Sequence, residues 1–315
     1  MLRERVIDRG KRLAWDLDEL RHVRPRDVAD FLLCRELGGK SRPPRSNVAI
    51  DDLPQSSALA VVAHPDDEVA AAGVILSRLS RLSRLGIIYV TDGAPRRGSD
   101  ARNAGFTNWI DYASGRRRET DSALALLGRE IAPLRNLGIA DQEATFELVD
   151  TSRCLADHFR AGFDYVITHP YEGGHPDHDA TAFCVHAACR LIAQAGGTPP
   201  AIVEARFYAA PQGRYVFSEF VPHSDAGPAL ALHLTPEEIE LKRRMYALHA
   251  SQQKHLVQFR LEEEVYRLAP RYHFSAPPHP GDVGFNQFKW PLSGRIWRFH
   301  ARRAMRQLGL VEDLA

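Results

Sequence analysis

The sequence predicts an α/β fold in which a mostly parallel sheet carries helices on both faces. The first observation is that short apolar segments, within 57–63, 86–91 and 163–168, each run into polar residues. The second is that two stretches with apolar residues at helical spacing, 69–82 and 115–128, alternate with these segments. Strands that alternate with helices are typical of parallel sheets buried on both sides. We therefore expect a Rossmann-like arrangement, with ligands bound outside the carboxyl ends of the strands.

The sequence pattern divides the chain into three parts. Residues 1–56 are a predicted helical extension followed by a linker rich in Gly, Pro and Ser. Residues 57–235 are the predicted α/β core, which includes a further strand near 201–209. Residues 236–315 are predicted to form C-terminal helices and a tail packed on the core.

The start of this last part has a typical helix signal. Thr235 precedes a proline, and Glu237 and Glu238 fall in the first turn, where carboxylates are favourable. The pattern predicts a long helix over 236–268 with a break near Ser251.

The composition excludes several classes of protein. With 44% hydrophobic residues, the 315-residue chain can bury a large core, so disorder and coiled coil are excluded as overall descriptions. The 41 basic and 40 acidic side chains give a net charge of +1, so no global charge attracts nucleic acid. Four scattered cysteines and an N-terminus that is charged throughout predict a cytoplasmic protein without a disulfide framework.

Two segments of the C-terminal part leave alternatives open. Segment 271–290 has aromatic residues among prolines and glycines, so it could cover a pocket and stack on a sugar ring, or it could pack as ordinary core. Segment 295–308 has the pattern of a basic amphipathic helix. Such a helix can lie on an anionic membrane surface, but packing against the main domain or a subunit in an oligomer is the commoner use.

Two expected strand ends each deliver a cluster of imidazole and carboxylate groups. The first strand runs into the motif HPDDE at 64–68, and the strand within 163–168 runs into His169 and then GGHPDH at 173–178. Neutral imidazole and ionised carboxylate are ligands that suit zinc or a similar divalent ion, and a catalytic site uses about three of them. His169 could contact such a site or could be a hydrogen-bonded loop histidine.

A ligand set can be assembled from the two loops. His64 and Asp67 from the first loop and His178 from the second would supply three ligands. Asp66 must point away from its neighbour Asp67, which leaves it free as a general base toward a bound water.

At these residues the sequence resembles a known family. AHPDDE at 63–68 and GGHPDH at 173–178 are similar to the motifs of metal-dependent de-N-acetylases related to N-acetylglucosaminyl-phosphatidylinositol deacetylase, a family that includes the mycothiol and bacillithiol pathway deacetylases. The resemblance covers roughly residues 57–260. Further matches follow in the same order: Thr91-Asp92-Gly93, Arg116-x-x-Glu119, Leu127-Gly128, Leu137-Gly138, Asp141, Lys242 and His249-x-Ser251-Gln252.

The resemblance implies a role for each residue of the two clusters. The implied ligands of zinc, or of another divalent ion such as Fe²⁺, are His64, Asp67 and His178. Asp66 would be the general base. His175 would stabilise the oxyanion of the tetrahedral intermediate as an imidazolium, and Asp177 would orient His175.

The resemblance also implies substrate contacts. The residues concerned are Asp92, Arg116 and Asp141. Each of these residues could instead have a purely structural role. Arg116 could belong to a solvated helix start, Asp92 to an Asx turn and Asp141 to a helix cap.

These residues predict an enzyme. We interpret the chain as a zinc-dependent hydrolase that removes an N-acetyl or small N-acyl group from an amino sugar or glycoconjugate, so the expected partner is a small N-acetylated molecule. The same machinery could act on a thiol conjugate or a natural-product precursor. A third alternative is a non-catalytic, metal-containing sugar-binding protein, against which the presence of Asp66 and His175 argues, since a binder needs neither.

Overall fold

The computed structural model describes residues 57–80, 85–128, 134–217, 219–288 and 290–310. The predicted extension and linker at 1–56 therefore lie outside the described residues.

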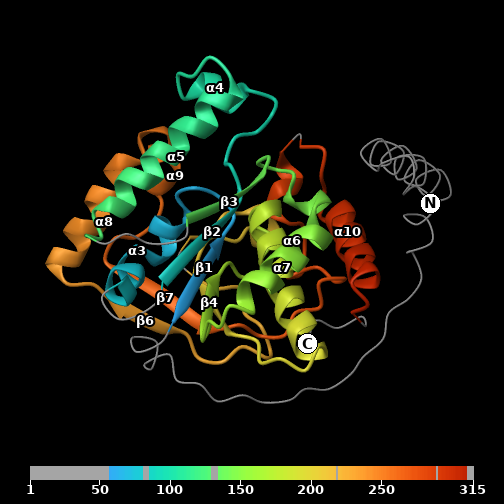
Figure 1. Cartoon of the computed structure of the whole chain (residues 1–315). Helices are drawn as coiled ribbons and strands as arrows, with labels where there is room; N and C mark the ends of the chain where they lie inside the picture. The colour runs from blue at the N-terminus through green and yellow to red at the C-terminus, as the bar shows by residue number, and fades with distance from the viewer. Residues whose placement is uncertain (1–56, 81–84, 129–133, 218, 289, 311–315) are drawn as a thin grey trace.

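A seven-stranded sheet forms the centre of the molecule, in the order β3-β2-β1-β4-β5-β7-β6 (Figure 1). The strands are β1 (Ala58–Val62), β2 (Leu85–Thr91), β3 (Leu134–Ile139), β4 (Tyr165–Thr168), β5 (Ala201–Ala205), β6 (Leu230–His233) and β7 (Glu263–Leu268). Strands β1 to β5 are parallel, whereas β7 is antiparallel to both of its neighbours. The predicted α/β fold with a mostly parallel sheet is confirmed.

Helices cover both faces of this sheet (Figure 1). On one face lie α3 (Asp67–Ser80), α5 (Trp109–Ala125), α8 (Pro236–Leu248) and α9 (Gln253–Leu256). On the other face lie α6 (Leu148–Phe159), α7 (Pro176–Gln194) and α10 (Gly294–Gln307). Helix α4 (Ser99–Asn103) precedes α5, and short 3₁₀ turns occupy Ala144–Phe146, Pro211–Gly213, Ala250–Gln252 and Gly284–Gln287.

Strand β1 shows why the sheet is buried on both sides. Leu59 and Val61 belong to the core under α6, α7 and α10, whereas Ala60 and Val62 belong to the core under α3 and α8. Successive side chains of a strand point to opposite faces, so an all-apolar strand needs a helical layer on each face.

Three strands differ from the sequence prediction. The long helix expected over 236–268 ends at Leu248, and the predicted break near Ser251 is confirmed by the 3₁₀ turn there. The continuation as helix is wrong, because residues 263–268 form β7 and pair with β5 and β6. Pairing across the sheet overrides the helical preference of a Glu- and Leu-containing segment. Strands β3 and β6 were not predicted.

Strands β6 and β7 lie on either side of the boundary predicted between residues 235 and 236, yet they belong to one sheet. The three-part division of the chain stays a prediction.

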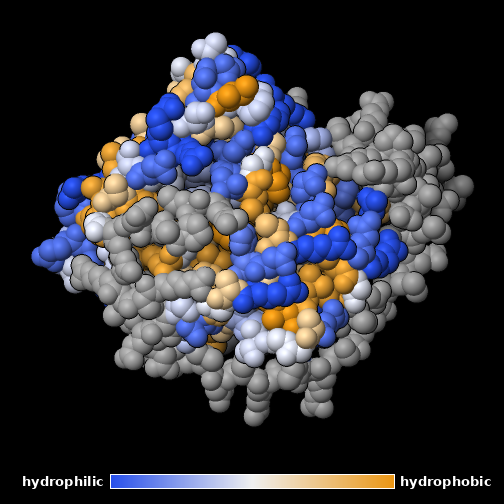
Figure 2. All heavy atoms as spheres, in the orientation of Figure 1, coloured by the Kyte–Doolittle hydropathy of each residue, from blue (hydrophilic) through white to orange (hydrophobic). Residues whose placement is uncertain are grey.

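Helix α10 packs its apolar face on the domain. Ile296, Trp297, Phe299 and Met305 are buried, and Trp297 Nε1 donates a hydrogen bond to the Pro176 carbonyl at 3.1 Å. The packing alternative for 295–308 is therefore the one that the structure shows, while membrane contact stays a prediction. Among the described helices, none has the length and apolarity to cross a membrane. On the face in Figure 2, hydrophilic residues gather over α4 and α10, with apolar patches between them.

Glu264 on β7 ties the C-terminal part of the sheet to α3. Its Oε1 accepts hydrogen bonds from Lys242 Nζ at 3.0 Å and from the Val74 N–H at 2.9 Å, and its Oε2 accepts from the Ile75 N–H at 3.0 Å. The side chains of Lys242 and Glu264 are at most 1% exposed. Because α3 begins at Asp67, this buried pair fixes a helix that starts in the predicted site.

We predict that Glu264→Leu destabilises the protein by about 3–5 kcal/mol, because Lys242 is left as an uncompensated buried charge. Arg243→Ala is the matched control, since Arg243 pairs with Glu240 through side chains more than half exposed and such a pair contributes about 0–1 kcal/mol. Denaturant unfolding measures both. Equal losses in the two variants would contradict a structural role for the buried pair.

Candidate metal and catalytic centre

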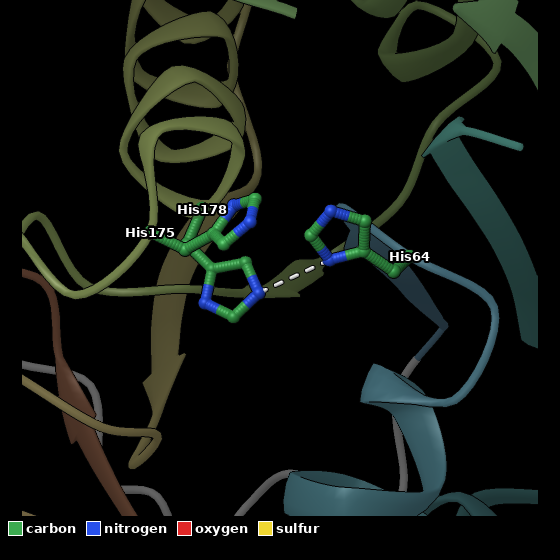
Figure 3. A group of neighbouring side chains, drawn as sticks. All are labelled: His64, His175 and His178. Carbon is green, nitrogen blue, oxygen red and sulfur yellow. Dashed lines mark hydrogen bonds between the residues drawn. The ribbon is translucent and has the colours of Figure 1, made fainter. Parts of the chain in front are cut away.

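The predicted site lies where β1 and β4 end. These strands are direct parallel neighbours, with Ala58 opposite Tyr165 and Ala60 opposite Ile167. The loops that follow them therefore meet at one edge of the sheet, as in other parallel sheets that bind ligands there. Figure 3 shows the imidazoles of His175 and His178, at the start of α7, facing that of His64 in the loop after β1.

The three predicted metal ligands lie close together, and we call them the donor triangle; its two edges to Asp67 end on different carboxylate oxygens. His64 Nδ1 lies 3.3 Å from Asp67 Oδ2 and 3.3 Å from His178 Nε2, and His178 Nε2 lies 3.4 Å from Asp67 Oδ1. A tetrahedral zinc ion about 2.1 Å from each ligand holds the ligands about 3.4 Å apart. The donor set therefore fits a divalent ion, and the assignment as ligands stays a prediction.

The surroundings of the second ring nitrogen of His64 support its assignment as a metal ligand. Nε2 lies 3.3 Å from Asp141 Oδ1 and 3.3 Å from Asp177 Oδ2. Two carboxylates favour a proton on Nε2, which leaves the Nδ1 lone pair on the side of the donor triangle. Burial lowers the pKa of His64, but Asp141 and Asp67 outweigh it and hold the pKa well above its ordinary value. Positive charge is thus favoured here, as a divalent ion would supply.

Asp177 contacts His175 through its backbone N–H, while its carboxylate lies beside His64. Its Oδ2 lies beside His64 and accepts the Gln142 N–H at 2.6 Å, and its Oδ1 accepts the Ala144 N–H at 3.2 Å. The Asp177 backbone N–H, rather than its carboxylate, contacts His175, because His175 caps the N-terminus of α7. The carboxylate consequently points to the loop after β3 and orients His64.

The role of His175 as an imidazolium at the oxyanion stays a prediction. Its Nδ1 accepts the Asp177 N–H at 3.2 Å, which favours the neutral tautomer with its proton on Nε2. Burial lowers the pKa of His175 well below its ordinary value, and neighbouring His64 and His178 lower it further. The Nε2 atom can also join the nitrogens of His64 and His178, and these three form an alternative ligand group.

Asp66 is held beside the donor triangle. Its Oδ1 accepts a hydrogen bond from Arg116 Nη2 at 2.6 Å, and its N–H donates to Glu68 Oε2 at 3.0 Å. Its φ of 155° is a sparsely populated conformation for a residue with a Cβ, of a kind that clusters at functional sites. Burial raises the pKa of Asp66 to about 7, although Arg116 opposes the shift. A carboxyl group with such a pKa can exchange a proton near neutral pH.

The predicted substrate residues occupy three different environments. Arg116 is 3% exposed and donates to the carbonyls of Pro65 and Gly93 as well as to Asp66. A Cβ at Gly93 would lie 2.4 Å from Arg116 Nη1, which explains the glycine after Asp92. Substrate contact by Arg116 stays a prediction, and the structure shows it positioning Asp66.

Asp92 and Asp141 occupy different positions relative to the cavity. Asp92 pairs with Arg96 at 2.7 Å and accepts the Ala94 N–H at 3.0 Å, which is the Asx-turn alternative. Asp141 lines the cavity over the site, 3.3 Å from His64, whereas Asp92 is not among the residues that line it. Substrate contact stays a prediction for both.

The fold decides two features that the sequence leaves open, namely the place of His169 and the partner of Glu119. His169 accepts the Ala63 N–H at 2.9 Å, lies 3.3 Å from Asp67 Oδ2 and stacks on His178 at 4.0 Å, so it supports two predicted ligands. Glu119 accepts hydrogen bonds from the N–H and the hydroxyl of Ser251. The matched pairs Arg116-x-x-Glu119 and His249-x-Ser251 were the available signal, but only the fold shows that they bind one another.

A cavity of about 900 Å³ opens over the donor triangle. Six aromatic side chains line it beside the site, and we call them the aromatic wall: Tyr208, Tyr215, Phe217, Phe259, Phe288 and Trp290. Phe288 and Trp290 belong to segment 271–290 and line the cavity, while their stacking on a sugar ring stays a prediction. Tyr272, Phe274 and Phe285 of the same segment are buried in the core, which was the alternative.

Comparisons with known proteins bear on the family and the fold. Residues 59–189 match the profile of the PIG-L family, described as GlcNAc-PI de-N-acetylase. No curated protein sequence matches the chain.

Solved structures share the fold. The zinc-inhibited form of teicoplanin deacetylase Orf2 and a complex of a deacetylase with teicoplanin each match with a TM-score of 0.53 and 16% identity, over 68% of this chain and 98% of theirs. The A40926 pseudoaglycone deacetylase Dbv21 matches with a TM-score of 0.53 and 18% identity, over 68% of this chain and 97% of its own.

We predict that His178→Ala lowers the bound metal, since one corner of the donor triangle is lost. His233→Ala is the control, because His233 is exposed on β6, away from the site. Elemental analysis after dialysis measures the metal-to-protein ratio. A full complement of metal in His178→Ala would argue against its role as a ligand.

We also predict that Asp177→Asn weakens metal affinity about 10–100-fold, because the carboxylate partner of His64 Nε2 is lost. Competition with a chromogenic chelator measures the affinity. Asp150→Asn, a change at a side chain 83% exposed, is the control and should leave it unchanged. Unaltered affinity in Asp177→Asn would show that Asp177 does not act through His64.

Proposed function

Because the chain carries a domain of the GlcNAc-PI de-N-acetylase family, we propose that it is a hydrolytic N-deacetylase that removes the acetyl group from an amino sugar or glycoconjugate. The ion proposed for the site is zinc or another divalent metal such as Fe²⁺. The observation that carries the proposal is the donor triangle of His64, Asp67 and His178 with the carboxyl of Asp66 beside it in one cavity. The family description names an N-acetylglucosamine conjugate, which supports an amino sugar as substrate.

Each residue of the site has its own role in the proposed hydrolysis. When bound, the ion supplies Lewis acidity and makes water a nucleophile near neutral pH. Arg116 holds Oδ1 of Asp66, so Oδ2 remains to accept the proton of the attacking water. Asp66 then delivers that proton to the amine as the C–N bond breaks, and the products are acetate and a free amine.

His175 stabilises the charge that develops on the acetyl oxygen. The helix cap fixes its proton on Nε2, and Nε2 faces the space between Asp141 and the two ligand histidines. A neutral imidazole can donate one hydrogen bond to an oxyanion without first acquiring a proton. This role requires the Nδ1 hydrogen bond to Asp177, which sets the tautomer.

We predict that Asp66→Asn lowers kcat by about 10²–10⁴-fold while the protein keeps its metal, since Asn cannot exchange a proton and lies outside the donor triangle. The assay detects the amine released from N-acetylglucosamine and its glycosides. Asp225→Asn, at an exposed carboxylate, is the control for activity and metal content.

Undiminished turnover in Asp66→Asn would reject the assigned base. A metal-loaded wild-type protein that binds N-acetyl sugars and releases no amine from them would instead identify a binding protein.

A further inference from the structure

The aromatic wall is a continuous surface that starts at the metal site. Tyr208 lies 5.1 Å from His178, and Trp290 lies 5.0 Å from His175, measured between ring centroids. From Tyr208 the contacts continue to Phe217 at 5.3 Å, and from there to Phe259 at 5.4 Å.

The other branch of the wall runs outward to the solvent. Phe288 stacks on Trp290 with centroids 4.7 Å apart and planes 23° apart, and it also contacts Tyr215 at 6.3 Å. Phe288 is 45% exposed, whereas most large apolar side chains of the described residues are covered. An aromatic patch exposed inside a concave site is typical of a ligand-binding surface.

The rest of the cavity lining includes several polar side chains. Asp100 and Asn103 come from α4, and Gln253, Lys254 and Gln258 come from the region of α9, while Phe106 and Tyr112 add two further aromatic rings. A volume of about 900 Å³ is near the upper end of the range of about 300–1,000 Å³ for small-molecule sites, so the cavity has room for more than one sugar ring.

The aromatic wall lies entirely outside the part of the chain that matches the family. That match ends at residue 189, and the first residue of the wall is Tyr208. The wall is thus a feature of this chain's later segments, and the hydrolysis of an acetamide does not require it.

We propose that the aromatic wall binds an aromatic aglycone, so that the substrate is an N-acetylated amino sugar carrying an aryl group. The inference rests on the proposed function for the position of the acetamide, which must reach the donor triangle. With the acetamide there, the aglycone extends along Trp290 and Phe288, where flat rings continue the existing stack. Polar groups of the sugar can then meet the polar side chains of α4 and of the region of α9.

Binding and turnover test this assignment separately. On the full-length, metal-loaded Asp66→Asn variant, calorimetry compares phenyl, methyl and octyl N-acetyl-β-glucosaminides. We expect the phenyl glycoside to bind about tenfold more tightly than the methyl glycoside, from added stacking. We expect the octyl glycoside to gain less than the phenyl glycoside. On the otherwise unaltered protein, kcat/KM should show the same order.

Variants of the aromatic wall test whether it is the source of the preference for the phenyl glycoside. Phe288→Ala and, independently, Phe217→Ala should bring the phenyl-to-methyl ratio toward one. Ile110→Ala is the matched control, because Ile110 is an apolar side chain 56% exposed that does not line the cavity, and it should keep the ratio.

The outcomes separate the two proposals. Equal affinities for the phenyl and methyl glycosides, an octyl glycoside that binds as tightly as the phenyl one, or an unchanged ratio in both wall variants would overturn the aryl subsite while hydrolysis continues. A phenyl preference that depends on Phe288 in a protein that hydrolyses none of the glycosides would retain the subsite and reject the proposed reaction.

Discussion

The parallel pairing of β1 with β4 is the constraint on which the site depends. His64 and His178 are far apart in the chain, yet their ring nitrogens are 3.3 Å apart because each follows a strand whose neighbour delivers the other. Side-chain contacts reinforce the pairing, since Thr168 Oγ1 donates to the Val61 carbonyl at 2.8 Å. A shift of register by one residue would move the two loops by about 3.3 Å and open the donor triangle.

The same edge of the sheet has to bury several carboxylates close together, and each is held by a specific partner. Asp67 accepts the His64 N–H at 2.7 Å, Asp66 accepts from Arg116, and Asp177 accepts two backbone N–H groups of the loop after β3. Buried charges are costly unless they are paired and hydrogen-bonded. The contacts that offset this cost also fix which oxygen and which nitrogen face the centre, so electrostatics and orientation have one origin.

Sequence reasoning reached the fold and the two site loops because both are local patterns, apolar strands followed by polar motifs. The sequence did not reveal features that depend on contacts between residues far apart in the chain. Asp177 lies between two histidines in the sequence, but the capping of α7 by His175 turns its carboxylate to His64. Arg116 lies in a run of three arginines typical of a solvated helix, but only the fold brings it to Asp66. Residues 263–268 favour a helix by composition, and the free edge of β5 makes them a strand.

The division between chemistry and selectivity follows from the same architecture. The donor triangle depends on β1, β4 and α7, whereas the aromatic wall comes from later segments that can change without altering the sheet. The two are joined at Gly174, whose carbonyl accepts the Tyr215 hydroxyl at 3.2 Å. A Cβ at Gly174 would lie 2.2 Å from the Tyr208 carbonyl oxygen, so the motif GGHPDH needs a glycine there to let the wall approach. Gly174 belongs to the loop of the predicted metal site. It therefore also sets how closely the aromatic wall can lie to the reacting amide.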